Sequence, residues 1–110
     1  MKYISNELYW GKVRISDICS LVGSPFYLYN YDVIKRKFKN IENAFKNVNH
    51  ILCYALKANS NLAILNSIAQ WGYGAEVVSG GELFLALRAG FSPGKIVFSG
   101  AGKTEYELTY

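Results

Sequence analysis

Apolar and polar positions alternate with a helical period in the first half of the chain. Residues 31–46 carry an apolar stripe beside charged positions, which predicts an amphipathic helix. The stripe consists of Val33, Ile34, Phe38, Ile41 and Phe45. Residues 1–30, interrupted by glycine and proline, predict an irregular, strand-leaning lead with a short strand at residues 26–29.

From residue 50 onward, short apolar runs alternate with amphipathic segments. The runs predict strands at residues 51–56, 75–78 and 96–98, the first of them buried on both faces. Helices are expected at residues 62–71, at residues 82–89 and from residue 104 onward. Ser60 or Asn61 offers an N-cap for the first of these helices. Two capping boxes are expected, because a glutamate follows three residues after a hydroxyl residue at Ser79–Glu82 and at Thr104–Glu107.

This order of elements places the chain in the α/β class. Strands that alternate with helices predict a parallel sheet with right-handed crossovers. Two architectures fit the pattern, an open doubly wound sheet or the first βα units of an eight-fold TIM barrel. A chain of 110 residues is too short for a closed barrel, so a barrel would be incomplete.

Composition narrows the possible classes of protein. Hydrophobic residues make up 51% and charged residues 18%, which excludes a disordered chain. The net charge is +4, and the densest group of lysines and arginines lies at residues 35–39. We interpret that group as a solvated helix face, so no nucleic-acid partner is expected. Two cysteines and one histidine predict neither a disulfide framework nor a metal site. Without a signal peptide or membrane-length apolar run, we expect no membrane partner and a cytoplasmic protein.

Lys57 is the first candidate for chemistry. It follows an apolar strand, and alternation would place it on the same face as the small residues Cys53 and Ala55. The carboxyl end of a parallel strand is where α/β enzymes carry reactive groups. A partly desolvated lysine there can attack an aldehyde. The alternative is a lysine that ends the strand and points to solvent.

Glu76 is the second candidate, since it stands among apolar residues in the next strand. A carboxylate in a buried strand needs a partner, and Lys57 ends the preceding strand. We therefore expect the two side chains to face the same cavity, although an ordinary structural salt bridge would also explain Glu76.

The segment at residues 100–104, Gly-Ala-Gly-Lys-Thr, invites comparison with a phosphate-binding loop. That motif requires a glycine five positions before Gly102, where this chain has Val97. We interpret the segment as a strand-to-helix loop capped by Thr104.

Several linked motifs together resemble the diaminopimelate decarboxylases, which are fold-type III enzymes dependent on pyridoxal phosphate. The most specific is Tyr-Ala-Leu-Lys-Ala-Asn-Ser-Asn at residues 54–61, which resembles the family's cofactor-lysine segment. Further resembling segments follow in the family's order, at residues 23–29, 74–83, 86–91 and 96–100.

The resemblance implies the first βα units of an alanine-racemase-like TIM barrel at residues 31–110, incomplete here, and a lead at residues 1–30 that belongs to a β domain. It implies pyridoxal 5'-phosphate as cofactor, Lys57 as its covalent attachment point, and Glu76 near it. Glu76 stands where the family usually has Asp, and Glu82 matches an acidic position that some related enzymes have near the cofactor.

The reaction implied is the decarboxylation of meso-2,6-diaminopimelate, a small-molecule amino-acid substrate, to L-lysine and carbon dioxide. The full-length enzyme would be a homodimer. The family's other cofactor and substrate residues come later than position 110, so the chain is expected to be an inactive N-terminal part. An ornithine, arginine or carboxynorspermidine decarboxylase, an amino-acid racemase, or a non-catalytic fragment stays open as an alternative.

Overall fold

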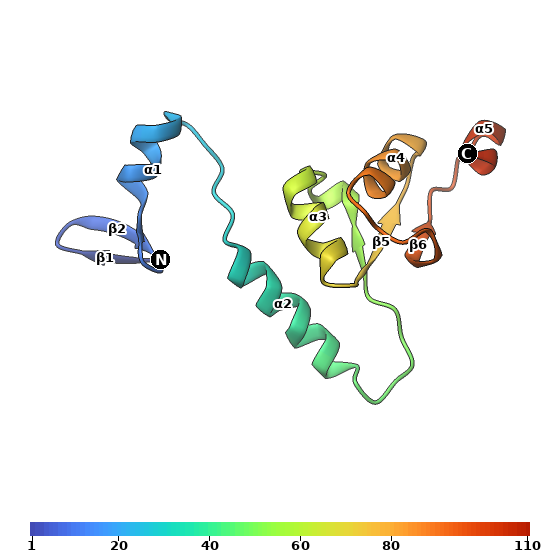
Figure 1. Ribbon diagram of the computed structural model, residues 1–110, viewed down its shortest axis with the longest axis horizontal. Coiled ribbons are helices and arrows are strands. Elements are labelled where there is room, and N and C mark those ends of the chain that lie inside the picture. The colour runs from blue at the N-terminus through green and yellow to red at the C-terminus, as the bar shows by residue number, and fades with distance from the viewer. The chain divides into compact units, whose positions relative to one another are not determined.

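The computed structural model describes all residues, Met1–Tyr110, and the chain divides into two compact units. The first unit is Met1–Ile34 and the second is Lys35–Tyr110 (Figure 1). We describe each by itself.

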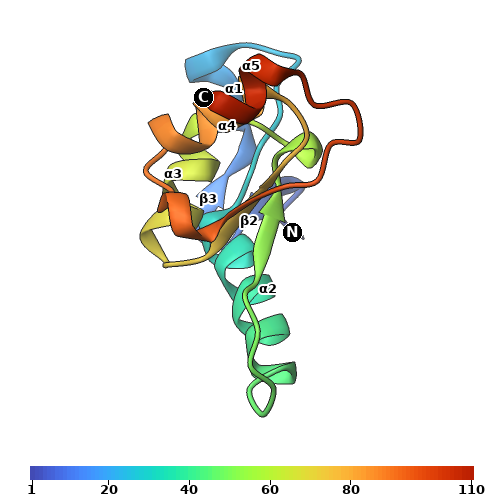
Figure 2. The same cartoon turned by 90° about the vertical axis from the view of Figure 1, so that its right-hand side faces the viewer.

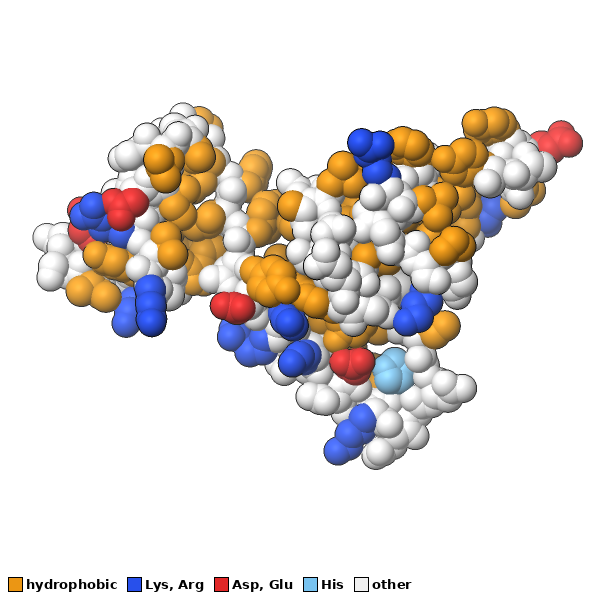
Figure 3. Space-filling model, in the orientation of Figure 1, with side chains coloured by type: hydrophobic (Ala, Val, Ile, Leu, Met, Phe, Trp, Pro, Cys, Tyr) orange, Lys and Arg blue, Asp and Glu red, His pale blue; other side chains and the backbone are white.

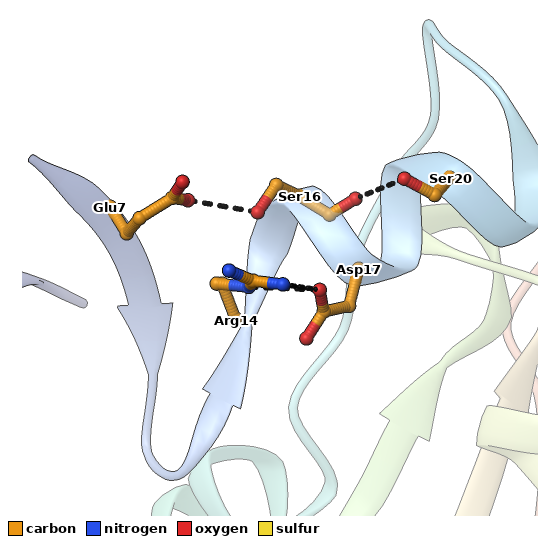
Figure 4. A network of polar contacts seen from close by, with 5 residues as sticks. All are labelled: Glu7, Arg14, Ser16, Asp17 and Ser20. Atoms are coloured by element: carbon orange, nitrogen blue, oxygen red, sulfur yellow. Dashed lines mark hydrogen bonds and ion pairs between the residues drawn. The ribbon is translucent and has the colours of Figure 1, made fainter.

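The first unit opens with a small antiparallel meander. Strands β1 (Lys2–Ile4), β2 (Glu7–Trp10) and β3 (Val13–Arg14) pair in that order. Helix α1 (Ile15–Val22) follows directly and is tied to the strands by polar contacts (Figure 4). The Ser16 hydroxyl donates to the Glu7 carboxylate at 2.8 Å, and Arg14 pairs with Asp17. The strand-leaning expectation for this lead is therefore confirmed for its first half.

The second half of the lead differs from the prediction. Helix α1 was not expected, although Gly23 ends it in a left-handed conformation (φ 79°) and donates its N–H to the Cys19 carbonyl. The predicted strand at residues 26–29 is wrong, because no neighbouring strand lies beside it to complete a ladder. Its Tyr27 is 91% exposed.

The second unit is built around a parallel sheet, as the alternation predicts (Figures 1 and 2). Its strand order is β4 (Cys53–Ala55), β5 (Gly74–Val77), β6 (Ile96–Phe98). Helix α3 (Leu62–Gln70) connects the first pair of strands, and α4 (Gly80–Arg88) with the short turn η2 (Pro93–Lys95) connects the second. Helix α5 (Glu105–Thr109) follows β6.

Helix α2 (Tyr31–Ala44) precedes this sheet and confirms the predicted amphipathic helix, ending two residues earlier than expected. Its Phe38 packs against Tyr73 with ring centroids 4.7 Å apart. Glu42 accepts a hydrogen bond from the Tyr73 hydroxyl at 2.8 Å. The pKa of Tyr73 is raised to about 12, mainly by burial and to a lesser extent by this hydrogen bond. Basic side chains gather along α2 on the surface (Figure 3).

One face of the sheet carries the core, which lies entirely in the second unit. Its buried residues come from the sheet, from η1 (Leu56–Ala58), from α3 and from α4 with the turn after it. They are Leu56, Leu65, Ile68, Ala75, Val77, Ala86, Ala89 and Phe91. Ala75 and Val77 of β5 point to this side and are fully buried, whereas Glu76 between them points to the other side and is only partly buried.

Strand β4 is shorter than predicted, and the expectation that it is buried on both faces is wrong. Only Cys53–Ala55 pair as a strand, all three are partly exposed, and Ile51 before them is 64% exposed. The cause is that α3 and α4 cover only one side of the sheet. No helix of the chain has the length and apolar character of a membrane span.

Candidate functional site

The candidate site lies on the sheet face that the helices leave uncovered. In the parallel register, Ala55 of β4 and Val97 of β6 flank Glu76 of β5. Residues opposite each other in a sheet point to the same side, so these three share one face with Cys53. Val97 is 50% exposed, which marks this face as open.

Lys57 follows the carboxyl end of β4, as predicted, but it does not continue the strand's alternation. It occupies the middle of η1, a single 3₁₀ turn that follows Ala55. Leu56 anchors this turn with a fully buried side chain, and the turn contacts both β5 and α4. The Lys57 side chain is exposed and makes no hydrogen bond or ion pair. The turn therefore fixes the lysine's backbone while leaving its amine available.

Glu76 is partly buried and bonds to a residue that the sequence interpretation missed. The Ser99 hydroxyl donates a hydrogen bond to the Glu76 carboxylate. Ser99 comes two positions after Val97, so alternation past the strand end could have placed it on the same face. No ion pair joins Glu76 to Lys57, and the structural salt bridge considered as an alternative is absent as well.

The loop after β5 is held by two carboxylates. Glu82 of α4 accepts from the Val78 N–H at 2.8 Å, and the Ser79 hydroxyl accepts from the Glu82 N–H at 3.2 Å. The first predicted capping box is thus half formed, because the glutamate bonds one residue earlier than the motif requires. Glu107 of α5 accepts from the Gly80 N–H at 2.7 Å.

The loop after β6 is the capped strand-to-helix connection that was expected. Thr104 and Glu107 form the complete capping box, and the Lys103 ammonium donates to the Gly100 carbonyl at 2.7 Å. Gly100 has no room for a side chain, since a Cβ there would lie 2.5 Å from the Val78 carbonyl oxygen. The two strand ends therefore approach each other closely.

The surroundings of two further groups shift their pKa values. Burial, and then the charge of Glu76, raises the pKa of the Cys53 thiol, so the thiol stays protonated near neutral pH. Hydrogen bonds from the Thr104 and Gly80 N–H groups and the Thr104 hydroxyl lower the pKa of Glu107. No group of three or more His, Cys, Asp or Glu side chains is placed to hold a metal ion.

The arrangement suits covalent capture of a carbonyl compound. An exposed lysine without a hydrogen-bond or ion-pair partner follows the first strand of a parallel sheet, and the neighbouring strand carries a carboxylate. Such an amine can form an imine with an aldehyde such as that of pyridoxal phosphate. Pyridoxal phosphate therefore fits the residues present.

Comparison with known proteins matches this chemistry. Residues 31–110 match the family described as pyridoxal-dependent decarboxylase, pyridoxal binding domain. The diaminopimelate decarboxylase of Helicobacter pylori strain J99 is 55% identical over 85 residues, covering 77% of this chain and 21% of that protein. The diaminopimelate decarboxylase of Aquifex aeolicus is 40% identical over 109 residues, covering 99% of this chain and 26% of that protein.

A solved structure also resembles the chain over most of its length. It is the diaminopimelate decarboxylase of M. jannaschii in co-complex with L-lysine, with a TM-score of 0.91 and 34% identity. The alignment covers 94% of this chain and 25% of that one. The chain therefore spans between 21% and 26% of the length of these relatives.

Proposed function

Because the chain belongs to the pyridoxal-dependent decarboxylase family, we propose that it supplies the lysine-bearing part of an enzyme that converts meso-2,6-diaminopimelate to L-lysine and carbon dioxide. The observation that carries the proposal is the position of Lys57, unpartnered at the carboxyl end of β4 and next to the uncovered face. The choice of substrate is supported by the relatives, which are diaminopimelate decarboxylases, one of them solved with L-lysine.

Each residue of the site has a distinct task in this proposal. Lys57 holds the cofactor covalently, and its 3₁₀ turn keeps the attachment point fixed over the end of β5. Glu76 places a negative charge on the same face, where it stabilises positive charge near the lysine nitrogen. The cofactor, when bound, supplies the electron withdrawal that makes loss of carbon dioxide possible.

The larger architecture follows from the same family membership. Residues 31–110 form the first βα units of an alanine-racemase-like TIM barrel, and residues 1–30 belong to a β domain. In this arrangement further parallel strands would pair with β4 and β6, whose outer edges lie free in the chain. The complete enzyme would act as a cytoplasmic homodimer.

A chimera tests this function. The 110 residues replace the matching segment of the Aquifex aeolicus diaminopimelate decarboxylase. The alignment with that segment covers 99% of this chain. The chimera should release carbon dioxide from meso-diaminopimelate, and borohydride reduction should leave a pyridoxyl group on Lys57, detected by mass spectrometry. The chain on its own should show no turnover, because a lysine alone does not fix the reacting bond relative to the cofactor.

A matched pair of variants controls the experiment. Lys57→Ala should reduce carbon dioxide release to background and remove the label, whereas Lys37→Ala, on the exposed side of α2, should change neither. A pyridoxyl group on a different lysine of the active chimera would contradict the assignment.

A further inference from the structure

We propose that Tyr54 is a positioning residue whose hydroxyl holds the turn that carries Lys57. The inference rests on the proposed function, because it concerns how the cofactor lysine is presented. Tyr54 belongs to β4, just before the lysine turn. Its hydroxyl donates a hydrogen bond to the backbone carbonyl of Asn59, which follows that turn, at 3.3 Å. The tyrosine side chain therefore spans the turn from one side of the lysine to the other.

The lysine turn is too short to be stable through its own hydrogen bonds. η1 covers only Leu56–Ala58, and a single 3₁₀ turn fixes several torsions in return for few hydrogen bonds of poor geometry. The fully buried side chain of Leu56 anchors the first residue of the turn. Lys57 is exposed, so its own side chain adds no such anchor. The carbonyl of Asn59 gives the turn a second attachment, after the lysine.

The ring of Tyr54 is a firm support because the core holds it. In the parallel register Tyr54 lies beside the fully buried Ala75, so both point to the covered face. The ring packs against the core, and its centroid lies 6.0 Å from that of Phe38. A tyrosine side chain has only two torsions, so a packed ring leaves its hydroxyl little freedom. The hydroxyl thus extends the order of the core to the far end of the lysine turn.

Asn59 connects the same turn to the next helix. Its side-chain Oδ1 accepts from the Asn61 N–H at 3.0 Å. The Asn61 side chain in turn accepts from the Ala63 N–H at 2.9 Å, as the N-cap of α3. The hydroxyl of Tyr54 therefore ties β4 to the start of α3 across the lysine turn. This restricts the backbone from which the Lys57 side chain extends.

A pair of variants separates this role from a general contribution to the aromatic cluster. Tyr54→Phe removes the hydroxyl and keeps the ring. Tyr73→Phe is the matched control, because Tyr73 also packs against Phe38 and its hydroxyl donates to Glu42. Tyr73 directly precedes β5, at the opposite end of the parallel sheet from the lysine turn. Each variant therefore loses a hydroxyl that forms a hydrogen bond, and only one of the two hydroxyls is bonded beside Lys57.

Amide hydrogen exchange of the 110-residue chain, measured by NMR, follows the turn itself. In a 3₁₀ turn each N–H pairs with the carbonyl three residues earlier, so the amides of Ala58 and Asn59 report on η1. Relative to Ile68 of the core, their exchange should accelerate about two- to fivefold in Tyr54→Phe, as expected for loss of one rather long neutral hydrogen bond. Tyr73→Phe should leave this ratio unchanged.

Capture of the cofactor is the second measurement. In the Aquifex aeolicus chimera, the pyridoxyl label on Lys57 after borohydride reduction is followed over a range of pyridoxal phosphate concentrations. The apparent affinity should weaken at least about twofold in Tyr54→Phe, because capture draws on the fraction of molecules in which the turn is held. Tyr73→Phe should bind as the parent does.

The two measurements together decide the inference. Unchanged exchange in Tyr54→Phe would overturn it, and so would equal changes in both variants. Faster exchange with unchanged capture would also overturn it, because the hydroxyl would then stabilise the turn without presenting the lysine. A parent chimera without a label on Lys57 would contradict the proposed function, whereas the exchange measurement would still show whether Tyr54 holds the turn.

Discussion

The two faces of the β4–β5–β6 sheet have opposite physical character although they are built from the same strands. On the helix-covered face, Ala75 and Val77 are fully buried. On the other face, Glu76 from the same strand is partly buried and Val97 is 50% exposed. One face of this single layer therefore carries the hydrophobic core, and the other carries Glu76 and the serine bonded to it.

Two valines on neighbouring strands test this separation most directly. Val77→Ala should lower the free energy of unfolding by about 2–3 kcal/mol, because it removes two buried methyl groups and leaves a cavity. Val97→Ala removes the same atoms from the uncovered face and should cost about 0.5 kcal/mol or less. Urea unfolding curves with equal slopes would give both values.

Equal losses for the two valines would contradict the comparison. They would mean that the second face is also buried in solution.

The covered face was largely predictable because elements buried on one side carry apolar residues at a regular spacing in the sequence. Helix α3 was expected at residues 62–71 and lies at Leu62–Gln70, capped by Asn61 as proposed. The strand at residues 96–98 was placed correctly. In both, apolar spacing and capping residues act over a few positions, so local sequence determines the element.

The uncovered face was less predictable because its features depend on contacts between distant segments. The 3₁₀ turn that carries Lys57 interrupts the alternation from which its side-chain direction was inferred. The bond between Ser99 and Glu76 joins residues 23 positions apart, and no local pattern encodes it. In the first unit, α1 was missed because residues 1–30 were interpreted as an irregular lead interrupted by glycine and proline, whereas Gly23 ends a helix.

The uncovered face should also govern how the isolated chain associates. The half-exposed Val97 on this face lies on a strand with a free edge, and this combination favours contact between molecules. Val97→Asp should weaken self-association at least tenfold, because burying a second carboxylate directly opposite Glu76 costs more than about 1.4 kcal/mol. Sedimentation over a range of concentrations would measure the change.

A second aspartate substitution serves as the control. Leu21, on α1, is 85% exposed and belongs to the first unit, so Leu21→Asp should leave association unchanged if the sheet face is responsible. A similar weakening by both variants would indicate that added charge, rather than the face itself, prevents contact.

The smallest expected effect concerns the attachment of α5 to the covered side, which depends on charge instead of apolar burial. The pKa of Glu107 lies below its ordinary value of 4.5, first because of the Thr104 N–H and then because of the Gly80 N–H. A carboxyl whose folded pKa is lowered stabilises the fold above its unfolded value, and this contribution is lost as pH falls through the lower, folded value. The contact between α5 and the start of α4 should therefore persist at pH 5 and weaken only below pH 4.5.

The Gly80 amide reports this contact, since its N–H donates to Glu107 at 2.7 Å. In a pH titration followed by NMR, its chemical shift should change with a midpoint below 4.5. Glu107→Gln keeps an acceptor oxygen but removes the charge, so the step should vanish at Gly80. Glu105→Gln, two residues earlier in the same helix, should leave the step in place. A Gly80 midpoint at or above 4.5 would show that the carboxylate is not held there in solution, and that α5 joins the covered side without help from its charge.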